Sequence, residues 1–219
     1  MNNTNKTVVV GMSGGVDSSV SAYLLKEQGY KVIGLFMKNW QNEPGEVCTS
    51  EIDFEDASSV CDSLNIPLHK ANFSDQYWDK VFKEFLSEHQ KGRTPNPDIL
   101  CNREIKFKSF LNYALTIGAD FIATGHYASL EKTNKGMNLC RAKDLDKDQT
   151  YFLHEVNSNE FEKCIFPLNN LYKTEVREIA KKIGLYNATK KDSVGICFVG
   201  EKNLKDFLGR FIDLKKGQI

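Results

Sequence analysis

The chain has 219 residues, with 29 basic and 29 acidic side chains, so its formal net charge is zero. Hydrophobic residues make up 41% and charged residues 26% of the sequence, which is typical of a globular protein. This balance excludes nucleic-acid binding through an overall basic field, and any such binding must use local patches. No apolar run is long enough to span a membrane, and residues 1–6 are too short and polar for a secretion signal. We therefore expect a cytoplasmic protein that does not enter a membrane.

Strands and helices are predicted to alternate along the chain. The apolar run Val8 to Val10 predicts a short buried strand, and an apolar face over 16–29 predicts a helix after it. Residues 31–37 form a continuous apolar run, which is typical of a strand covered on both faces. Asp53 and Ser74 are predicted to cap the next two helices. We expect further strands at 67–73 and 121–126, a hairpin at 130–140, and helices at 53–64, 74–86, 102–116, 151–156, 174–184 and 204–211.

This order of elements predicts an α/β fold. Strand–helix–strand units of this kind are right-handed and build a doubly wound, mostly parallel sheet with helices on both faces. We expect a first domain at 1–145 and a mainly helical C-terminal segment at 146–219. The aromatic stripe on helix 74–86 has helical spacing, so it is predicted to pack in the core rather than stack on bases. Ligands of such sheets bind beyond the carboxyl ends of the strands, which is where residues 11–19 fall.

Residues 11–19 read Gly-Met-Ser-Gly-Gly-Val-Asp-Ser-Ser and are predicted to form a phosphate-binding turn. Gly14 and Gly15 let the backbone turn sharply and approach a ligand, and the free N–H groups of the following helix face an anion. Asp17 could hold a Mg²⁺ ion that accompanies phosphates. The turn matches neither G-x-x-x-x-G-K-[ST] nor G-x-G-x-x-G, and a plain glycine turn is the alternative. Hydroxyl donors are expected from Ser13, Ser18 and Ser19.

Residues 92–102 read Gly-Arg-Thr-Pro-Asn-Pro-Asp-Ile-Leu-Cys-Asn. The two prolines are predicted to exclude helix and to stiffen this loop, so that Asp98 and Cys101 stand at the entrance to the next helix. A thiolate is favoured at a helix N-terminus, and a carboxylate beside it suits catalysis. The alternative is a rigid connector with an incidental cysteine. Cys197 precedes Phe198 and on its own would be interpreted as a core thiol; spacing does not show that the two cysteines meet.

The other cysteines carry no catalytic signal. Cys61, Cys140 and Cys164 lie in apolar surroundings and are predicted to fill the core, while Cys48 falls in a loop and receives no role. No C-x-x-C pair is present, so we expect no zinc site. Segment 91–108 has five basic residues against two acidic ones, which gives a modest positive patch that a solvated helix face would also explain.

Six motifs follow one another in the chain. They are Gly-Met-Ser-Gly-Gly-Val-Asp-Ser at 11–18, Gly-Leu-Phe-Met-Lys-Asn-Trp at 34–40, Arg-Thr-Pro-Asn-Pro-Asp-Ile-Leu-Cys-Asn at 93–102, Ala-Thr-Gly-His-Tyr at 123–127, Lys-Asp-Gln at 147–149 and Gly-Ile-Cys-Phe at 195–198. The first resembles the SGGxDS signature of the PP-loop ATP pyrophosphatases, whose fold is like that of the adenine nucleotide alpha-hydrolases. The whole set, over nearly the whole chain, resembles the bacterial tRNA-specific 2-thiouridylases.

The resemblance implies an ATP-dependent thiolation of the wobble uridine of tRNA, with Mg²⁺ as the companion of ATP. ATP adenylates the C2 oxygen of the uracil, and a persulfide on Cys197, received from a sulfur-relay protein, supplies the sulfur. The terminal sulfur would attack C2 itself, or Cys101 would release it as hydrosulfide. Cys101 would close a disulfide with Cys197 and free the sulfur, and Asp98 would act as general acid and base. This order is chemically reasonable, because a uracil carbonyl is a poor electrophile and a persulfide is a good nucleophile.

The resemblance also assigns binding residues by position. The nucleotide site is implied to consist of Gly11, Met12, Ser13, Gly14, Gly15, Val16, Asp17, Ser18, Met37 and Gly125. Contacts with the target base are implied for Asn96, Pro97 and Asp98, and other contacts with tRNA for Lys147, Asp148 and Gln149.

Proteins of this family continue past this length, with a small linking domain and a β-barrel that add to tRNA binding. The sequence given ends at Ile219, near where that part would begin, so we expect the β-barrel to be absent, the nucleotide pocket to form, and tRNA to bind weakly. A fragment and a naturally short protein both remain open. So do two other functions: a PP-loop enzyme that adenylates a small substrate, and a non-catalytic remnant that binds ATP or a sulfur carrier.

Overall fold

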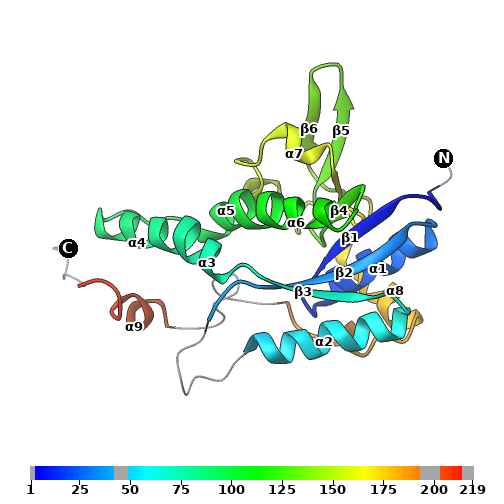
Figure 1. Ribbon diagram of the computed structural model, residues 1–219, viewed down its shortest axis with the longest axis horizontal. Helices are drawn as coiled ribbons and strands as arrows, with labels where there is room; N and C mark the ends of the chain where they lie inside the picture. The colour runs from blue at the N-terminus through cyan, green and yellow to red at the C-terminus, as the bar shows by residue number, and fades with distance from the viewer. Residues whose placement is uncertain (1–2, 42–48, 193–202, 214–219) are drawn as a thin grey trace.

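The computed structural model describes residues 3–41, 49–192 and 203–213. Its centre is a five-stranded parallel sheet in the order β3-β2-β1-β4-β7, which confirms the predicted α/β fold (Figure 1). The strands are β1 (Thr7–Met12), β2 (Lys31–Lys38), β3 (Leu68–Asn72), β4 (Phe121–Ala123) and β7 (Cys164–Ile165). Within the described ranges, no helix combines the length and apolar character needed to cross a bilayer.

Helices cover both faces of the sheet because successive side chains of each strand point to opposite faces. In β1, Val9 belongs to one buried cluster, whereas Val8 and Val10 belong to the other. The cluster around Val8 and Val10 includes side chains of α1 (Val16–Glu27), α2 (Thr49–Leu64) and α8 (Lys173–Lys182). The cluster around Val9 includes side chains of the two long helices over 74–90 and 97–116, and Figure 1 shows these layers on either side of the strands.

The two long helices of the second layer each contain a π-helical section. The first consists of α3 (Ser74–Tyr77), η1 (Trp78–Phe82) and α4 (Lys83–Gln90), and the second of α5 (Pro97–Cys101), η2 (Asn102–Ser109) and α6 (Phe110–Thr116). The prediction that prolines exclude helix at 95–97 was wrong for Pro97. This residue occupies the first helical turn, where its missing N–H costs nothing and its fixed φ suits the helix.

Several predicted boundaries were also wrong. Helix α2 begins at Thr49, before the predicted cap Asp53, and the cap position of α3 is Phe73 rather than Ser74. The predicted strand 121–126 ends at Ala123, because the chain turns away from β1 there. In place of the predicted helix 151–156 there is one short 3-10 turn, η3 (Thr150–Phe152).

The remaining elements extend the sheet and cover its ends. The predicted hairpin is confirmed as β5 (Ser129–Thr133) and β6 (Gly136–Cys140), and it stands away from the sheet in Figure 1. Segment 146–219 supplies the edge strand β7 and helix α8, which packs against α1. It also contains the short elements α7 (Ser158–Phe161), η4 (Tyr186–Thr189) and α9 (Leu204–Leu208).

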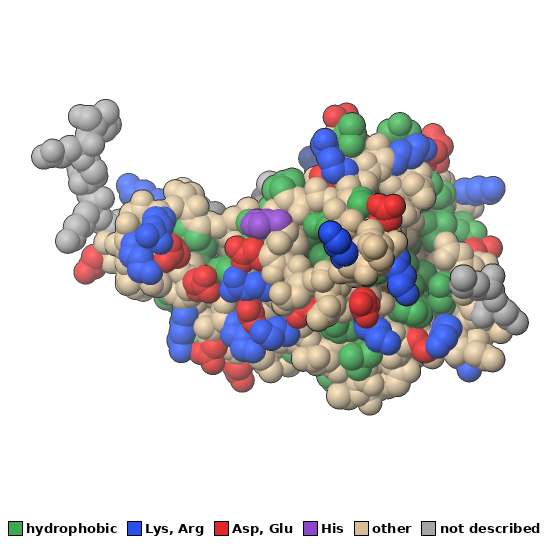
Figure 2. All heavy atoms as spheres, turned by 90° about the horizontal axis from the view of Figure 1, so that it is seen from above, with side chains coloured by type: hydrophobic (Ala, Val, Ile, Leu, Met, Phe, Trp, Pro, Cys, Tyr) green, Lys and Arg blue, Asp and Glu red, His purple; other side chains and the backbone are tan. Residues whose placement is uncertain are grey.

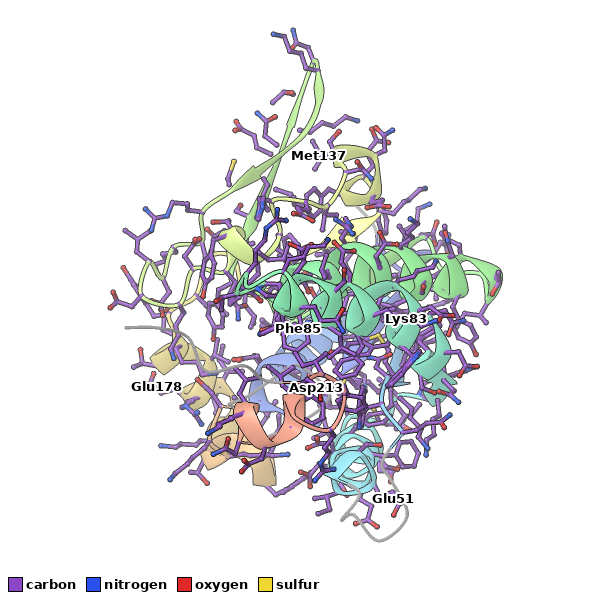
Figure 3. The ribbon with its side chains drawn as sticks, turned by 90° about the vertical axis from the view of Figure 1, so that its left-hand side faces the viewer. Glu51, Lys83, Phe85, Met137, Glu178 and Asp213 are labelled. Carbon is purple, nitrogen blue, oxygen red and sulfur yellow. The ribbon has the colours of Figure 1, made fainter. Side chains whose placement is uncertain are left out.

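The aromatic stripe of helix 74–86 packs in the core as predicted. Tyr77, Phe82 and Phe85 are almost completely buried, although Trp78 stays 38% exposed. Phe82 lies 5.6 Å, centroid to centroid, from Phe207 of α9, and Figure 3 shows α9 next to α4 with Phe85 on the helix above it. These rings are therefore occupied in joining α9 to the second helical layer.

Two of the three cysteines predicted to fill the core are buried. Cys61 and Cys164 lie in the two core clusters, and burial raises the pKa of the Cys61 thiol to about 12. Cys140 is only half-buried at the end of β6, so the core assignment was wrong for it. It is the last residue of the hairpin that stands off the sheet, and it belongs to neither buried cluster.

Candidate nucleotide and substrate site

A cavity of about 460 Å³ opens at the carboxyl ends of β1, β2 and β4. Strand β1 lies in the middle of the sheet, with β2 on one side and β4 on the other, so the strand order reverses at this point. Loops that leave neighbouring strands in opposite directions separate there and leave a crevice, which is the usual ligand position of such sheets. The loop after β1 and residues 124–126 after β4 form two of its walls, and residues at β2, α5, η2 and α8 complete it.

Most predicted site residues line this one cavity, although they come from distant parts of the sequence. Those on its wall are Gly11, Met12, Ser13, Gly15, Val16, Asp17, Ser18, Met37, Asp98, Gly125, Lys147 and Gln149. Those not on its wall are Gly14, Asn96, Pro97, Cys101 and Asp148. Cys197 and Cys48 lie outside the described residues.

The glycines of the nucleotide loop are needed for conformation and for space. Gly14 has φ +74°, and a Cβ on it would lie 2.7 Å from the carbonyl oxygen of Asp53. A Cβ on Gly125 would lie 2.9 Å from the backbone carbon of Asp17 and from the backbone nitrogen of Ser18. The two walls of the cavity therefore touch backbone to backbone, and the first turn of α1 is held open toward the cavity.

Two of the three predicted hydroxyl donors turn inward. The Ser18 and Ser19 hydroxyls donate to the Gly15 carbonyl oxygen at 3.0 and 2.9 Å. Ser19 is completely buried and does not line the cavity. The assignment of Ser19 to the ligand was therefore wrong, because a serine in the first turn of a helix can bond the carbonyl one turn back.

Asp17 is held by an ion pair that the sequence did not reveal. Lys173 Nζ, at the start of α8, donates to both carboxylate oxygens of Asp17 at 2.8 and 2.7 Å, and the Tyr127 hydroxyl donates to one of them at 2.9 Å. Burial and the Asp17 charge raise the pKa of Tyr127, so its hydroxyl keeps its proton. Asp17 thus accepts three hydrogen bonds from two side chains, and a metal ion at this carboxylate would have to displace Lys173.

Lys173 also lies 2.8 Å from Asp192, whose carboxylate lies within 3.2 Å of Lys147 and 3.1 Å of Arg177. Burial alone raises the pKa of Asp192, but the hydrogen bonds and charges of Lys173 and Lys147 outweigh it and lower that pKa overall. Asp192 is therefore ionised near neutral pH. It links the predicted tRNA contact Lys147 to the lysine that holds the nucleotide loop.

A second ion-pair cluster lies at the edge of the cavity. Lys190 Nζ lies 3.0 Å from Asp53 and 2.6 Å from Asp56, both on α2. Burial lowers and these carboxylates raise the pKa of Lys190, and the net effect is upward. The described residues contain no group of three or more His, Cys, Asp or Glu side chains that could hold a metal ion.

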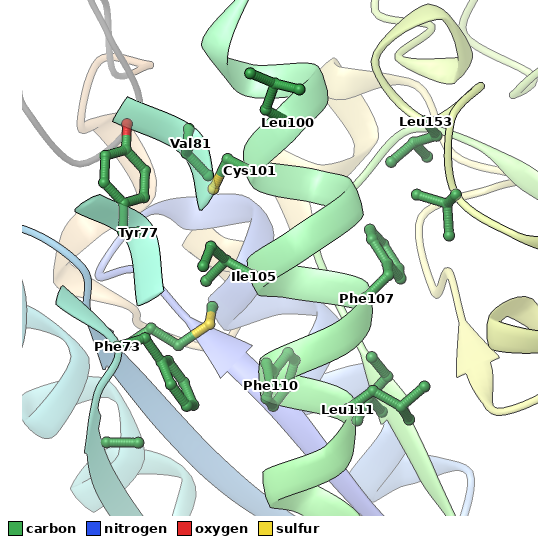
Figure 4. Close-up of a cluster of buried hydrophobic side chains, with 14 of the residues drawn as sticks. Phe73, Tyr77, Val81, Leu100, Cys101, Ile105, Phe107, Phe110, Leu111 and Leu153 are labelled. Atoms are coloured by element: carbon green, nitrogen blue, oxygen red, sulfur yellow. The ribbon is translucent and has the colours of Figure 1, made fainter. Parts of the chain in front are cut away.

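Asp98 and Cys101 lie on the same short helix but point to different surroundings. The Asn96 side chain caps α5 by accepting the Asp98 N–H at 2.9 Å, and Asp98 lines the cavity. Cys101, one turn later, has no exposed surface, and Figure 4 shows its sulfur directed toward Val81 and Tyr77. The prediction that a rigid loop presents both groups together is therefore wrong for this conformation.

The loop that carries Lys147, Asp148 and Gln149 is braced by its own side chains. Gln149 Oε1 accepts the Tyr127 N–H at 3.0 Å, and Asp148 accepts the Ala142 N–H at 2.9 Å. Lys147 and Gln149 remain on the cavity wall, whereas Asp148 does not. Asp148 thus shapes the loop in this conformation, and its neighbours face the cavity.

The basic excess of segment 91–108 is largely neutralised. Lys91 and Arg93 both pair with Glu88, Lys108 pairs with Glu104, and Arg103 pairs with three glutamates. Figure 2 shows Lys, Arg, Asp and Glu side chains interspersed on this face. The solvated-face interpretation therefore holds for most of the segment, and Lys106 is the residue of these five that lines the cavity.

The sequence matches the family model described as the tRNA methyl transferase HUP domain over residues 6–201. The chain belongs to this family. It is 60% identical over 213 residues to the tRNA-specific 2-thiouridylase MnmA of Legionella pneumophila (strain Lens), and 55% identical over 219 residues to the protein of the same description from Streptococcus agalactiae serotype III (strain NEM316). The resemblance to the tRNA-specific 2-thiouridylases is thereby confirmed. The matches cover 97% and 99% of this chain and 59% of each relative, so the chain spans about 59% of the length of these curated relatives.

Solved structures share the fold at low sequence identity. An NMN synthetase from Francisella tularensis superposes with a TM-score of 0.53 at 19% identity, over 92% of this chain and 71% of that one. The U34-tRNA thiolase NcsA from Methanococcus maripaludis gives 0.54 at 21% identity, over 84% and 58%. At these identities the comparison shows the shared α/β architecture.

Sequence reasoning missed several residues of the cavity wall of this HUP domain, among them Lys173, Tyr127 and Asn39. Lys173 stands at the first position of an amphipathic helix, where a lysine is ordinarily solvated, and its partner Asp17 is 156 residues away. Tyr127 and Asn39 did lie inside motifs already noted. The signal available for them was that they follow the ends of β4 and β2, at the ligand edge of the sheet.

Proposed function

We propose that this chain carries the activating and sulfur-transferring centre of a tRNA 2-thiouridylase. It binds ATP at residues 11–18, transfers AMP to the C2 oxygen of a wobble uridine, and replaces that oxygen with persulfide sulfur. The observation that carries the proposal is the single cavity that joins the nucleotide loop to Asp98, Lys147 and Gln149. The similarity to relatives described as tRNA-specific 2-thiouridylases supports it.

The cavity suits a nucleotide with its phosphates against α1. The first-turn N–H groups and the positive end of the helix dipole favour an anion there, and the close backbone contact at Gly125 fixes the position of this turn. Lys173 and Lys190 also lie on the cavity wall, each paired with two aspartates in this structure, and phosphates would compete with those aspartates for them. Mg²⁺ bound to the phosphates would compete with Lys173 for Asp17, so the proposal includes an exchange of partners at this carboxylate when Mg²⁺ and ATP enter.

In the proposed reaction Asp98 exchanges protons with the uracil, since it is the carboxylate of α5 that reaches the cavity. The terminal sulfur of a Cys197 persulfide attacks C2, and AMP leaves with the oxygen. Cys101 then attacks Cys197, forms a disulfide and frees the sulfur. Cys101 has no exposed surface in this conformation, so the proposal requires its sulfur to become accessible to Cys197 during the cycle. The sulfur on Cys197 comes from a sulfur-relay donor protein, and the setting is the cytoplasm.

The proposal is tested by incubating the chain with tRNA, ATP, Mg²⁺ and a persulfide donor, followed by mass spectrometry of the tRNA nucleosides. The expected result is 2-thiouridine that depends on both ATP and Cys197. AMP formation that depends on tRNA separates this function from adenylation of a small substrate. If AMP forms without tRNA and no 2-thiouridine appears, the proposal is wrong.

A further inference from the structure

Asn39 is a buried amide on the cavity wall with neither of its polar atoms in use. It follows the end of β2, is 2% exposed, and lines the cavity. Neither Nδ2 nor Oδ1 has a hydrogen-bond partner in the described part of the chain. Leaving buried polar atoms unsatisfied is costly, so such a pair of atoms indicates a missing partner that supplies an acceptor and a donor side by side.

The surroundings of Asn39 favour a flat heterocycle over phosphate or sugar. Its neighbours in sequence, Met37 and Trp40, are apolar, buried and on the same cavity wall. The ion pair of Lys173 and Asp17 instead lies at the nucleotide loop and α8, and no charged side chain of the wall belongs to residues 36–40. A nucleobase is the part of a nucleotide that has apolar faces and a polar edge.

Sheet topology indicates whether this base belongs to the bound nucleotide or is the uracil of the substrate. The phosphate loop follows β1, and β2 is the next strand of the same βαβ unit, paired with β1 along its full length. A mononucleotide whose phosphates lie at the first strand of such a unit extends its base toward the neighbouring strands of that half. Asn39 stands beyond the end of β2, whereas Asp98, the proposed uridine contact, belongs to the helical layer.

We propose that Asn39 binds the adenine edge of ATP, with Oδ1 accepting from the 6-amino group and Nδ2 donating to the adjacent ring nitrogen. This pairing rests on the proposed ATP site and adds the residue that recognises its base. An asparagine amide makes this bidentate pair with adenine when it reads DNA, and the geometry of the pair does not depend on the backbone of the ligand. Asn39 thus acts in substrate affinity, separately from the chemistry at Asp98.

The test uses two nucleotides that differ in one group: ATP and purine riboside 5′-triphosphate, which lacks the 6-amino group. Affinities are measured by calorimetry on the full 219-residue chain with Mg²⁺. The wild-type chain is expected to bind ATP about 10-fold more tightly than the analogue, because the analogue has no 6-amino group to donate to Oδ1 of Asn39. In Asn39→Leu, whose side chain branches at the same carbon but has no polar atom, this ratio should fall to nearly one.

Two controls separate the possible outcomes. Asn138→Leu makes the same change at an exposed position of β6 and should keep the wild-type ratio. Binding of inorganic pyrophosphate reports whether the phosphate loop of Asn39→Leu is intact. If wild-type chain binds ATP and the analogue equally, the adenine assignment is overturned, whatever the variant does. The adenine assignment is also overturned if Asn39→Leu keeps the wild-type ratio of the two affinities. It is overturned as well if the variant alters AMP formation only by changing how the uridine substrate binds. Failure of wild-type chain to bind ATP at all would instead overturn the proposed function.

Discussion

Replacing Gly125 by alanine tests whether the two walls of the cavity hold each other in place. The added Cβ would lie 2.9 Å from the Asp17 carbon and the Ser18 nitrogen, and both are backbone atoms. A normal contact is about 3.5 Å or more, so the loop or the start of α1 has to move by roughly half an ångström. Overpacking of this kind costs about 1–3 kcal/mol, and the smaller entropy of the unfolded alanine chain recovers about 0.4–1 kcal/mol of it.

With the middle of each range, the expected net loss for Gly125→Ala is about 1.3 kcal/mol in the free energy of unfolding, measured by urea denaturation. For a chain of this size the melting temperature should fall by roughly 3–5 °C. Because the displaced atoms include the first N–H groups of α1, ATP affinity should fall as well. Gly11→Ala is the matched control: its Cβ would meet side chains at 3.4 Å, which yield more easily than backbone, so its stability should change much less.

The result that would refute this reasoning is a Gly125→Ala chain as stable as wild type that binds ATP with unchanged affinity. The two walls would then be shown to move independently. A loss of stability equal in both variants would also contradict it, because the cost would then follow the residue type rather than the backbone contact.

Three further predictions concern the ion pairs, the cysteines and the buried imidazole. Lys173→Met leaves the carboxylates of Asp17 and Asp192 without their shared lysine. It should lower the free energy of unfolding in urea by about 1–2 kcal/mol, after allowance for the partial exposure of these groups. Lys182→Met, at an exposed position of α8, should change little, and equal losses in the two variants would contradict the role of the ion pair. Cys101→Ser and Cys197→Ser should each abolish 2-thiouridine while tRNA-dependent AMP release survives, and thiolation by either variant would rule out the two-cysteine step. Burial and a nearby lysine hold the pKa of His126 well below its usual value, so as pH falls below about 6.5 the unfolded chain takes up a proton that the folded chain does not. As pH falls, the free energy of unfolding should therefore decrease more steeply in wild type than in His126→Gln, by up to about 1.4 kcal/mol per pH unit. Parallel plots of this free energy against pH between 7.5 and 5.5 would contradict the low pKa of His126.

The sheet was predictable where its strands are long and covered on both faces. Continuous apolar runs identify β1 and β2, because a parallel strand buried on both sides has no polar alternation. Strand β7 has two residues and pairs only with β4, so its sequence carries too little pattern to be found. Pro97 was misjudged because a proline breaks a helix in its interior and starts one at its first turn, and local sequence does not say which applies.

The candidate site was predictable where a motif lies at the end of a strand, and less so where a helix brings a side chain from far away. Residues 11–18 and Gly125 follow β1 and β4, so the fold alone places them at the ligand edge. Lys173 could not be found, since helical periodicity puts it on the polar face of α8 and only the tertiary packing of α8 on α1 turns it toward Asp17. Cys101 was wrongly predicted to stand beside Asp98 at the site. The local sequence does not show that side chains of a neighbouring helix cover it.

The bonds that complete the nucleotide loop have a consequence for synthesis on the ribosome. Asp17 is synthesised 156 residues before its partner Lys173, and Gly14, whose carbonyl oxygen accepts from Asn187 Nδ2, is synthesised 173 residues before Asn187. At ordinary translation rates about 10–30 s separate the emergence of these partners. The loop nearest the start of the chain is thus among the last parts to reach its final surroundings, and the nascent chain gains a complete nucleotide site only after α8 and η4 have left the ribosome.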